Sequence, residues 1–366
     1  MQNLKNTGIF PSPKKFIEGD LITRPDWTVV ARNTNGVIPL DKNENLDREL
    51  QSFISDILKS IPVDIATEYP ECAPYYKKLS DHLHLNPENL LFAPGSDGAI
   101  RAVFETFVSP TQKVLQTNPS FAMYPLYTQM LGAESVLIDY KGSNNGPKLD
   151  VTEICKKIKM SQPDLLCLPN PDSPTGTIFS YNELERIVET CYQAEAMVLI
   201  DEAYHPFSDI TALPLISKYK NLVVARTFAK GWGIAGLRLG FAAAHRETVY
   251  QLHKVRPMYE VNGLALSVME RLIDNFNQIE AAVTRTLKGK SFFLKKMKGL
   301  GFKTLNCSGN FVHIDFGISR ELIHKKLAGK VLYKKSFNAP CLSGYSRFTV
   351  GPENIMSDVI NIIEEA

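Results

Sequence analysis

The sequence predicts an α/β protein with a largely parallel central sheet that is flanked by helices. Short apolar segments typical of buried strands recur along the chain, at residues 89–93, 113–117, 164–168, 197–200, 222–225 and 239–243. Amphipathic patterns typical of helices separate several of them, for example at residues 181–192. This alternation favours parallel strands that are covered on both faces.

A second, smaller α+β domain is expected from the two ends of the chain. A long helical pattern at 263–297 leads into strand-like segments at 310–316 and 346–350. The first forty residues are rich in Pro, Gly and Asn, which favours an irregular arm. We therefore expect a large domain at 45–261, and a small domain that combines 1–44, including the arm, with 262–366.

Composition and charge are those of an ordinary enzyme. The 366 residues are 44% hydrophobic, and a net charge of +2 gives no reason to expect nucleic-acid binding. The basic run Lys295, Lys296 and Lys298 fits a solvated helix face better than a nucleic-acid patch. No segment reaches the ~20 apolar residues of a membrane span, and residues 1–20 lack the apolar stretch of a secretory signal. Six cysteines without metal-like spacing predict reduced thiols in a cytoplasmic protein and no metal site.

The chemically unusual residues follow the expected strands, where ligands of such a sheet bind. The strand at 197–200 runs directly into Asp201, and a buried acid is costly unless it meets a positive partner. Asp201 therefore either faces a cationic ligand atom or caps a helix N-terminus. The strand at 222–225 leads into a glycine-rich turn with Lys230, whose amine becomes nucleophilic when burial favours its neutral form. Arg238 then presents a rigid fork suited to phosphate.

Two further turns have a functional and a structural interpretation. Residues 94–98 (Pro-Gly-Ser-Asp-Gly) join a strand to a helix, and the N–H groups of a helix N-terminus form an anion site. The same segment can equally be a helix cap without a ligand. Residues 170–176 contain two prolines and a glycine, so a rigid structural turn is the default. Each of these motifs is weak evidence by itself.

Together and in this order, the motifs resemble fold-type I pyridoxal-phosphate aminotransferases of class I/II, especially the histidinol-phosphate aminotransferase-like branch. They extend from about residue 40 to residue 351: Asn43-Glu44-Asn45, Tyr69-Pro70, Gly95-Ser96-Asp97, Asn-Pro-x-x-Pro-Thr-Gly at 170–176, Asp-Glu-Ala-Tyr at 201–204, the lysine turn, and Arg-x-Thr-Val-Gly at 347–351. The resemblance implies an aspartate aminotransferase-like large domain, pyridoxal 5'-phosphate as cofactor, and transfer of an amino group.

The resemblance also implies roles for individual residues. Lys230 matches the lysine that carries the cofactor as a Schiff base and moves the proton, Asp201 the acid that keeps the pyridine nitrogen protonated, and Tyr204 the phenol bonded to the ring oxygen. Positions that match other cofactor contacts are Ser96, Asp97, Phe121, Ser173, Thr227 and Arg238, and Tyr69 matches a tyrosine that reaches the phosphate of a neighbouring subunit. On the substrate side, Arg347 matches the arginine that holds the α-carboxylate, Asn43 lies in the first motif, and Lys334 falls nearest to a substrate-phosphate arginine. The role of Tyr69 implies a homodimer with shared active sites.

One residue departs clearly from the family pattern. The family has asparagine before Pro-Thr-Gly as a partner of the ring oxygen, where this chain has the shorter Ser173. The contact is then lost or passed to water, and Asn170 replaces it only if the turn is reshaped. The N-terminal arm also lacks the tyrosine that the histidinol-phosphate branch uses near its substrate, since the first tyrosine is Tyr69. These departures bear on the reaction and substrate more than on cofactor binding.

The expected function is amino-group transfer between an amino acid, glutamate above all, and a small oxo-substrate, with phosphorylated compounds among the candidates. The alternative with the same cofactor is a decarboxylase of a phosphorylated amino acid. A non-catalytic pyridoxal-phosphate-binding regulator is disfavoured, because we recognise no helix-turn-helix domain before residue 45. The expected partners are the small-molecule donor and acceptor and a second copy of the chain, with no nucleic acid and no membrane.

Overall fold

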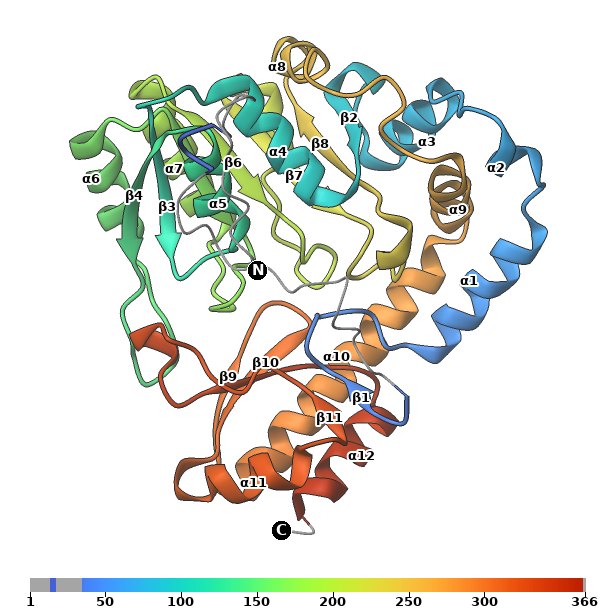
Figure 1. The fold of residues 1–366 in the computed structure, drawn as a ribbon, viewed down its shortest axis with the longest axis vertical. Helices are drawn as coiled ribbons and strands as arrows, with labels where there is room; N and C mark the ends of the chain where they lie inside the picture. Colours follow the sequence, from blue (N-terminus) through green and yellow to red (C-terminus); the bar gives the residue numbers. More distant parts are fainter. Residues whose placement is uncertain (1–13, 18–34, 365–366) are drawn as a thin grey trace, which may run out of the picture.

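The computed structural model describes residues 14–17 and 35–364, and it confirms the predicted fold class. Its centre is a seven-stranded sheet in the order β2-β8-β7-β6-β5-β3-β4 (Figure 1). The strands are β2 (Leu90–Ala93), β3 (Lys113–Asn118), β4 (Glu134–Asp139), β5 (Leu165–Pro169), β6 (Met197–Asp201), β7 (Leu222–Thr227) and β8 (Gly240–Ala244). The strands from β7 to β4 are parallel, whereas β8 is antiparallel to both of its neighbours.

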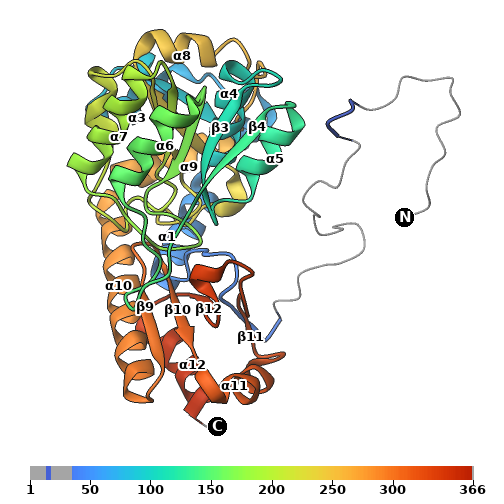
Figure 2. The same cartoon turned by 90° about the vertical axis from the view of Figure 1, so that its left-hand side faces the viewer.

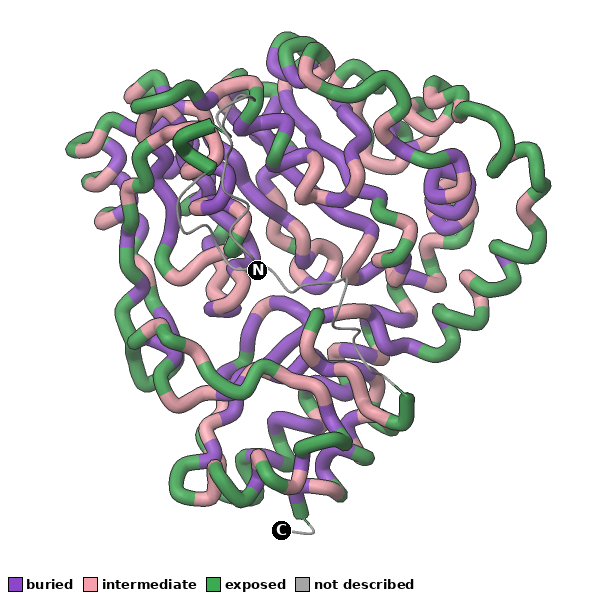
Figure 3. The backbone as a smooth tube through the Cα atoms, in the orientation of Figure 1, coloured by how far each residue is buried: buried purple, intermediate pink, exposed green. Residues whose placement is uncertain are grey.

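Helices cover both faces of this sheet, because successive strand side chains point to opposite faces. Leu165 and Cys167 belong to one hydrophobic cluster, and Leu166 and Leu168 belong to another. The first cluster includes residues of α4 (Gly95–Phe107), α5 (Met123–Met130) and α8 (Arg246–Leu252). The second includes residues of α1 (Arg48–Ser60), α3 (Ala73–Leu83), α6 (Val151–Ser161), α7 (Tyr181–Gln193) and α9 (Gly263–Asp274). Figure 3 shows the strands as the buried centre between these layers.

A smaller lobe contains an antiparallel sheet in the order β12-β10-β9. Its elements are α10 (Phe276–Gly299), β9 (Lys303–Asn306), β10 (Phe311–Asp315), α11 (Arg320–Leu327), β11 (Val331–Leu332), β12 (Ser346–Thr349) and α12 (Glu353–Glu364). Strand β1 (Ile38–Pro39) pairs with β11, so segments from both halves of the chain lie side by side. Figure 2 shows α10 running from the large sheet down into the small lobe. The remaining helices are α2 (Asp64–Thr67) and 3-10 turns at Pro87–Asn89, Leu213–Ser217, Ala235–Leu237, Gly317–Ser319 and Pro340–Leu342.

Two details differ from the sequence prediction. Strands β4 and β9 were not predicted. Each has only one buried residue, Ile138 in β4 and Leu305 in β9, so they lack the continuous apolar run of a buried strand. The single helical stretch expected at 263–297 is two helices that separate at Asn275. The division of the chain into domains at 45 and 261 stays a prediction. The expected irregular arm at 1–44 falls largely outside the described residues.

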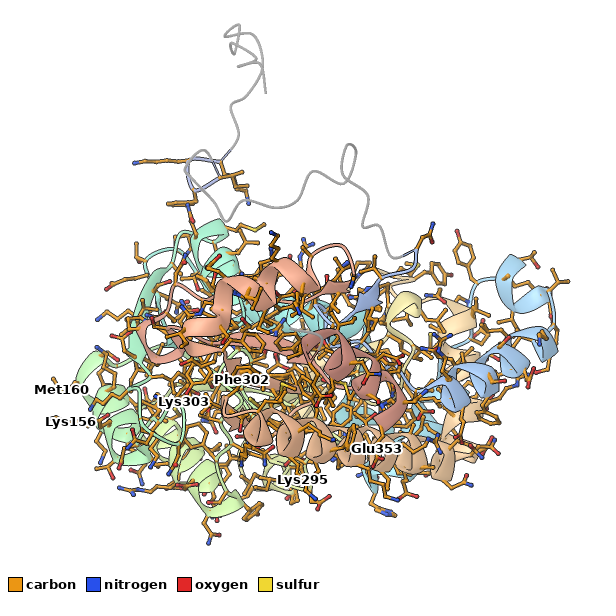
Figure 4. All side chains as sticks on the ribbon, turned by 90° about the horizontal axis from the view of Figure 1, so that it is seen from below. Lys156, Met160, Lys295, Phe302, Lys303 and Glu353 are labelled. Carbon is orange, nitrogen blue, oxygen red and sulfur yellow. The ribbon has the colours of Figure 1, made fainter. Side chains whose placement is uncertain are left out.

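The bulk predictions also have structural counterparts. Lys295, Lys296 and Lys298 are exposed on α10, and Figure 4 shows Lys295 at the outer surface. All six cysteines are free, and Cys72 alone is not buried. Within residues 14–17 and 35–364, none of the helices has the length and apolar character needed to cross a lipid bilayer.

Candidate active site

A cavity of about 310 Å³ lies at the carboxyl ends of β5, β6 and β7, between the large sheet and residues of the small lobe. This is the edge at which ligands of a parallel sheet are expected to bind. Eleven of the predicted site residues line the cavity: Asn43, Ser96, Asp97, Phe121, Ser173, Asp201, Tyr204, Thr227, Lys230, Arg238 and Arg347. A larger cavity of about 630 Å³ beside the start of α6 and α7 is lined by none of them.

Asp201 ends β6 and is 5% exposed. The Tyr124 hydroxyl donates to its Oδ2 at 2.9 Å, and the Ala203 N–H donates to its Oδ1 at 3.0 Å. Burial raises the pKa of Asp201 to about 6, although both hydrogen bonds oppose this shift. The residues after β6 form turns rather than a helix, so Asp201 caps no helix N-terminus. A cationic ligand atom here would favour the carboxylate form.

Lys230 lies in the loop three residues after the end of β7, the strand that pairs with β6, which ends at Asp201. Its Nζ donates to the carbonyl oxygen of Lys42 at 2.7 Å. Burial lowers its pKa, which makes the neutral amine more accessible. Because Lys230 and Asp201 line the same cavity, the amine and the acid reach one ligand from the same edge of the sheet.

Tyr204 is held by Asn43, a contact that the sequence did not predict. The Nδ2 of Asn43 donates to the Tyr204 hydroxyl oxygen at 2.8 Å. Asn43 has a backbone φ of 55° and is 2% exposed, and the Thr349 hydroxyl donates to its Oδ1 at 2.9 Å. The amide of Asn43 therefore connects the last strand of the small lobe with the phenol of Tyr204.

One end of the cavity is suited to an anion. Helix α4 begins at Gly95 after Pro94, and no side chain caps its first N–H groups. Ser96, Thr227 and Arg238 line the cavity at this end. A Cβ at Gly95 would lie 2.8 Å from Nη2 of Arg238, so glycine lets the guanidinium approach the start of the helix. Free N–H groups at a helix N-terminus and an arginine fork together bind phosphate well.

Arg347 on β12 reaches the cavity from the small lobe. Its Nη2 donates to the carbonyl oxygen of Asp41 at 2.9 Å, and its guanidinium lies 5.6 Å from the ring centre of Phe311. Its Nε is buried and has no hydrogen-bond partner among the described residues. The side chain thus retains capacity to bind a carboxylate.

Two predicted residues lie outside the cavity. Lys334 exchanges backbone hydrogen bonds with Arg347, but its side chain is exposed and its Nζ lies 6.0 Å from the Phe337 ring centre. Tyr69 is 73% exposed and stacks on Tyr259 with ring centres 4.0 Å apart. It lines a neighbouring cavity of about 620 Å³ that shares Arg238 with the candidate site.

In the turn after β5, the structure shows whether Asn170 can replace the asparagine that the family has at position 173. Ser173 lines the cavity. Asn170 is fully buried, its Oδ1 accepts the Phe179 N–H at 2.7 Å, and its Nδ2 donates to the Phe179 carbonyl oxygen at 3.2 Å. Asn170 therefore fastens the turn and does not replace the usual asparagine.

Sequence reasoning missed several supporting residues. Besides Tyr124, Tyr127 donates to Oδ1 of Asp97 at 2.9 Å. Glu202 is fully buried and pairs with Arg226, whose Nη2 lies 2.8 Å from its Oε2. Tyr124 and Tyr127 lie on α5, shortly after Phe121 in the sequence. The sequence does not reveal which of these aromatic residues contact Asp201 and Asp97. Glu202 is the second residue of the Asp-Glu-Ala-Tyr motif, so its position in that motif could have identified it as a supporting residue.

The residues present fit pyridoxal phosphate. The cavity contains a buried acid for a ring cation, an amine with a lowered pKa, and an uncapped helix N-terminus with an arginine for a phosphate. Glycine at 240 is also required, since a Cβ there would lie 2.5 Å from the backbone nitrogen of Ser96.

Comparison with known proteins agrees with this chemistry. The chain is 30% identical over 331 residues to the histidinol-phosphate aminotransferase of Caldanaerobacter subterraneus, covering 89% of this chain and 92% of the relative. Among solved structures, the histidinol-phosphate aminotransferase from Sinorhizobium meliloti in complex with pyridoxal-5'-phosphate has a TM-score of 0.77 at 19% identity, covering 90% of each chain. The L-threonine-O-3-phosphate decarboxylase from Porphyromonas gingivalis has a TM-score of 0.76 at 18% identity, covering 90% of this chain and 99% of the other. These two likenesses show the fold.

The sequence profile described as aminotransferase class I and II matches residues 35–363, nearly the whole described chain. The chain therefore belongs to the class I and II aminotransferases and is a pyridoxal-phosphate-dependent enzyme.

Proposed function

We propose that this aminotransferase takes the amino group of glutamate and delivers it to a small oxo compound that carries a phosphate group. The relatives named histidinol-phosphate aminotransferases support an acceptor of this kind. The observation that carries the proposal is the meeting of Lys230, Asp201 and Arg347 in one cavity. An amine, an acid and a carboxylate-binding arginine are the groups that amino transfer requires.

Each of these residues has a distinct chemical task in the proposal. When bound, the cofactor supplies an aldehyde and an electron-accepting ring. Asp201 keeps a positive charge on the ring nitrogen through charge pairing. Lys230, with its lowered pKa, accepts and returns the proton of the substrate Cα as general base. Arg347 fixes the substrate carboxylate and thereby decides which bond of Cα is aligned for cleavage.

The remaining cavity residues are assigned to the cofactor by their positions. Ser96, Thr227 and Arg238, with the start of α4, hold its phosphate. Phe121 packs on the ring, Tyr204 donates to the ring oxygen, and Asn43 fixes the Tyr204 hydroxyl. Asp97 holds the start of α4 through Tyr127, while Ser173 faces the ring oxygen directly or through water.

We further propose that the enzyme acts as a homodimer in the cytoplasm. Tyr69 lies on the surface beside Arg238, which suits a residue that completes the phosphate site of a second copy. Free cysteines are typical of a reducing compartment. Sedimentation at several protein concentrations tests the dimer, and a monomer that retains full activity would contradict the shared site.

A decarboxylase of a phosphorylated amino acid is the second candidate, and Ser173 is the observation that favours it. The shorter side chain changes the environment of the ring oxygen relative to the usual asparagine. Glutamate mixed with the holoenzyme is expected to yield 2-oxoglutarate and the amino form of the cofactor, followed by its spectrum. A subsequent screen of phosphorylated oxo compounds then identifies the acceptor. Release of carbon dioxide from a phosphorylated amino acid, without oxo-acid formation, would select the decarboxylase instead.

A further inference from the structure

Asp172 is a buried acid behind the cavity wall that the proposed mechanism does not use. It stands in the turn after β5, between Pro171 and Ser173, which both line the cavity, and it is fully buried. Its Oδ1 accepts the Thr175 N–H at 2.9 Å and also the Thr175 hydroxyl. Its Oδ2 is buried and has no hydrogen-bond partner among the described residues. An ionised carboxylate with a bare, buried oxygen is costly, whereas a protonated one is not.

The acid belongs to a chain of hydroxyl groups that leads to the small lobe. The Thr175 hydroxyl lies 2.9 Å from that of Thr177, which donates to the Tyr140 hydroxyl oxygen at 3.0 Å. Tyr140 packs in a cluster with Leu305 and Leu342 of the small lobe. The turn that carries Asp172 is therefore linked to the small lobe through Tyr140, and its carboxyl group is fully buried.

The groups whose charges couple most strongly to Asp172 are acids, phenols and thiols, and His313 lies beyond one of them, with its Nδ1 3.0 Å from the Cys307 sulfur. The coupled groups are Asp201 on β6, Tyr124 on α5, Tyr140 after β4, Cys307 before β10 and Cys341 in a 3-10 turn, together with the hydroxyl of Thr117 on β3. Burial raises the pKa of Asp172 from 3.8 to about 7, and Asp201 adds to this shift, while the hydrogen bonds from Thr175 and the nearby hydroxyl of Thr117 oppose it.

Asp172 lies in the turn after β5, and Asp201 lies at the end of β6, the strand that pairs with β5. The Asn170 N–H donates to the Asp201 carbonyl oxygen at 2.8 Å, which continues the pairing of β5 with β6. Two carboxyl groups that share a dry site resist ionising together, because each negative charge raises the cost of the other.

We propose that Asp172 is a proton-holding positioning residue of the cofactor site, which stays protonated while Asp201 is ionised. A single negative charge then faces the ring nitrogen. The inference rests on the cofactor site proposed above, but it concerns the protonation of this chain and needs no turnover. Asp172 lines no part of the cavity and acts through Asp201.

Infrared spectroscopy of the holoenzyme is the direct test, because a protonated carboxyl has a carbonyl band that an ionised one lacks. We expect a band of a buried acid at mildly acidic pH that disappears with a midpoint near neutrality and that is missing in Asp172→Asn. The matched control is Asp164→Asn at the opposite end of β5, whose carboxylate accepts the Lys113 N–H at 2.8 Å outside the cavity. This control should keep the band.

A second variant keeps the test independent of whether Asp172→Asn folds. Thr175→Val removes a hydroxyl that donates to Asp172 and should move the midpoint of the band to higher pH. A spectrum in which Asp172→Asn loses no carboxyl band, or an unchanged midpoint in Thr175→Val, would overturn the proposal. Loss of amino transfer with the band intact would instead count against the proposed function alone.

Discussion

The two sides of the cavity are built differently. On the sheet side, each acid or phenol is held by a neighbour: Tyr124 binds Asp201, Tyr127 binds Asp97, and Asn43 binds Tyr204. On the small-lobe side, the Nε of Arg347 has no partner among the described residues, and Lys334 is exposed. The sheet side is fixed in advance, as catalytic groups must be. The small-lobe side keeps hydrogen-bonding capacity for a group that arrives with the substrate.

The largest effect is expected on the sheet side, from Lys230→Ala. Without the amine, the enzyme loses both covalent attachment of the cofactor and its general base. General-base catalysis alone is worth ~10²–10⁴ in rate, so kcat with glutamate should fall by at least that factor, and the yellow colour should be lost. The exposed Lys295→Ala is the control. Wild-type activity or colour in Lys230→Ala would show that Lys230 neither binds the cofactor nor acts as the general base.

On the small-lobe side, Arg347→Lys should weaken binding of the amino-acid substrate and leave binding of the cofactor unchanged. Replacing a bidentate fork by a point charge loses about 1.5–3 kcal/mol of charged hydrogen bonding, or ~10–100-fold in kcat/KM. Steady-state kinetics with glutamate and titration with the cofactor measure the two effects separately. Arg320→Lys, which alters an arginine paired with Asp315 at 2.9 Å outside the cavity, is the matched control. Equal losses of cofactor and substrate binding would show that Arg347 does not act on the substrate alone, contrary to the difference proposed between the two sides.

A smaller effect is expected for Tyr124→Phe, which removes one support of Asp201. The pKa of Asp201 is raised from 3.8 to about 6, so the folded chain without cofactor holds more protons than the unfolded chain between these pH values. Its stability therefore falls as pH rises through this window. Losing the hydrogen bond should extend the fall to higher pH, at a cost of about 0.5–1.5 kcal/mol. Thermal unfolding of the cofactor-free protein at several pH values tests this.

Tyr127→Phe, which removes the hydrogen bond to Asp97, is the control for that series. It should leave the pH dependence between these values unchanged. If both variants shift the profile equally, Tyr124 does not act through Asp201.

The smallest effect is expected for Lys334→Ala. Its exposed ammonium is worth about 0–1 kcal/mol to an approaching phosphate, so kcat/KM for a phosphorylated acceptor should fall a few-fold and that for an unphosphorylated acceptor should not. Lys335→Ala, next to it, is the comparison. The same loss with both acceptors would show that Lys334 does not bind the substrate phosphate.

The same contrast explains how far the sequence alone could lead. Asp201 and Lys230 were predictable because parallel strands end at one edge, so residues at or shortly after these ends lie near the same space. Arg347 followed from the resemblance alone, whereas Ser96 and Arg238 were also indicated by the chemistry of their turns, and all three line the cavity. Their catalytic and binding roles remain predictions. Strands β4 and β9 were missed because exposed strands lack the apolar run that marks buried ones.

Residues that lie behind the cavity lining could not be predicted from the sequence pattern. Tyr124 and Asp172 are informative only through their burial and partners, and neither is visible in a local pattern. Lys334 pairs with Arg347 along the backbone, which the sequence did not predict, and strand pairing does not determine where a long side chain points.

The reversed direction of β8 has a consequence for how this enzyme can diverge. Strands β7 and β8 form a hairpin in which Thr227 pairs with Gly240, and the connecting loop carries both Lys230 and Arg238 (Figure 1). The loop is closed by the Phe228 N–H, which donates to the Leu239 carbonyl oxygen at 3.0 Å. Adding or deleting one residue here would displace the amine from the guanidinium, whatever the rest of the fold does. The length of this connection therefore sets the spacing between the Lys230 amine and the Arg238 guanidinium.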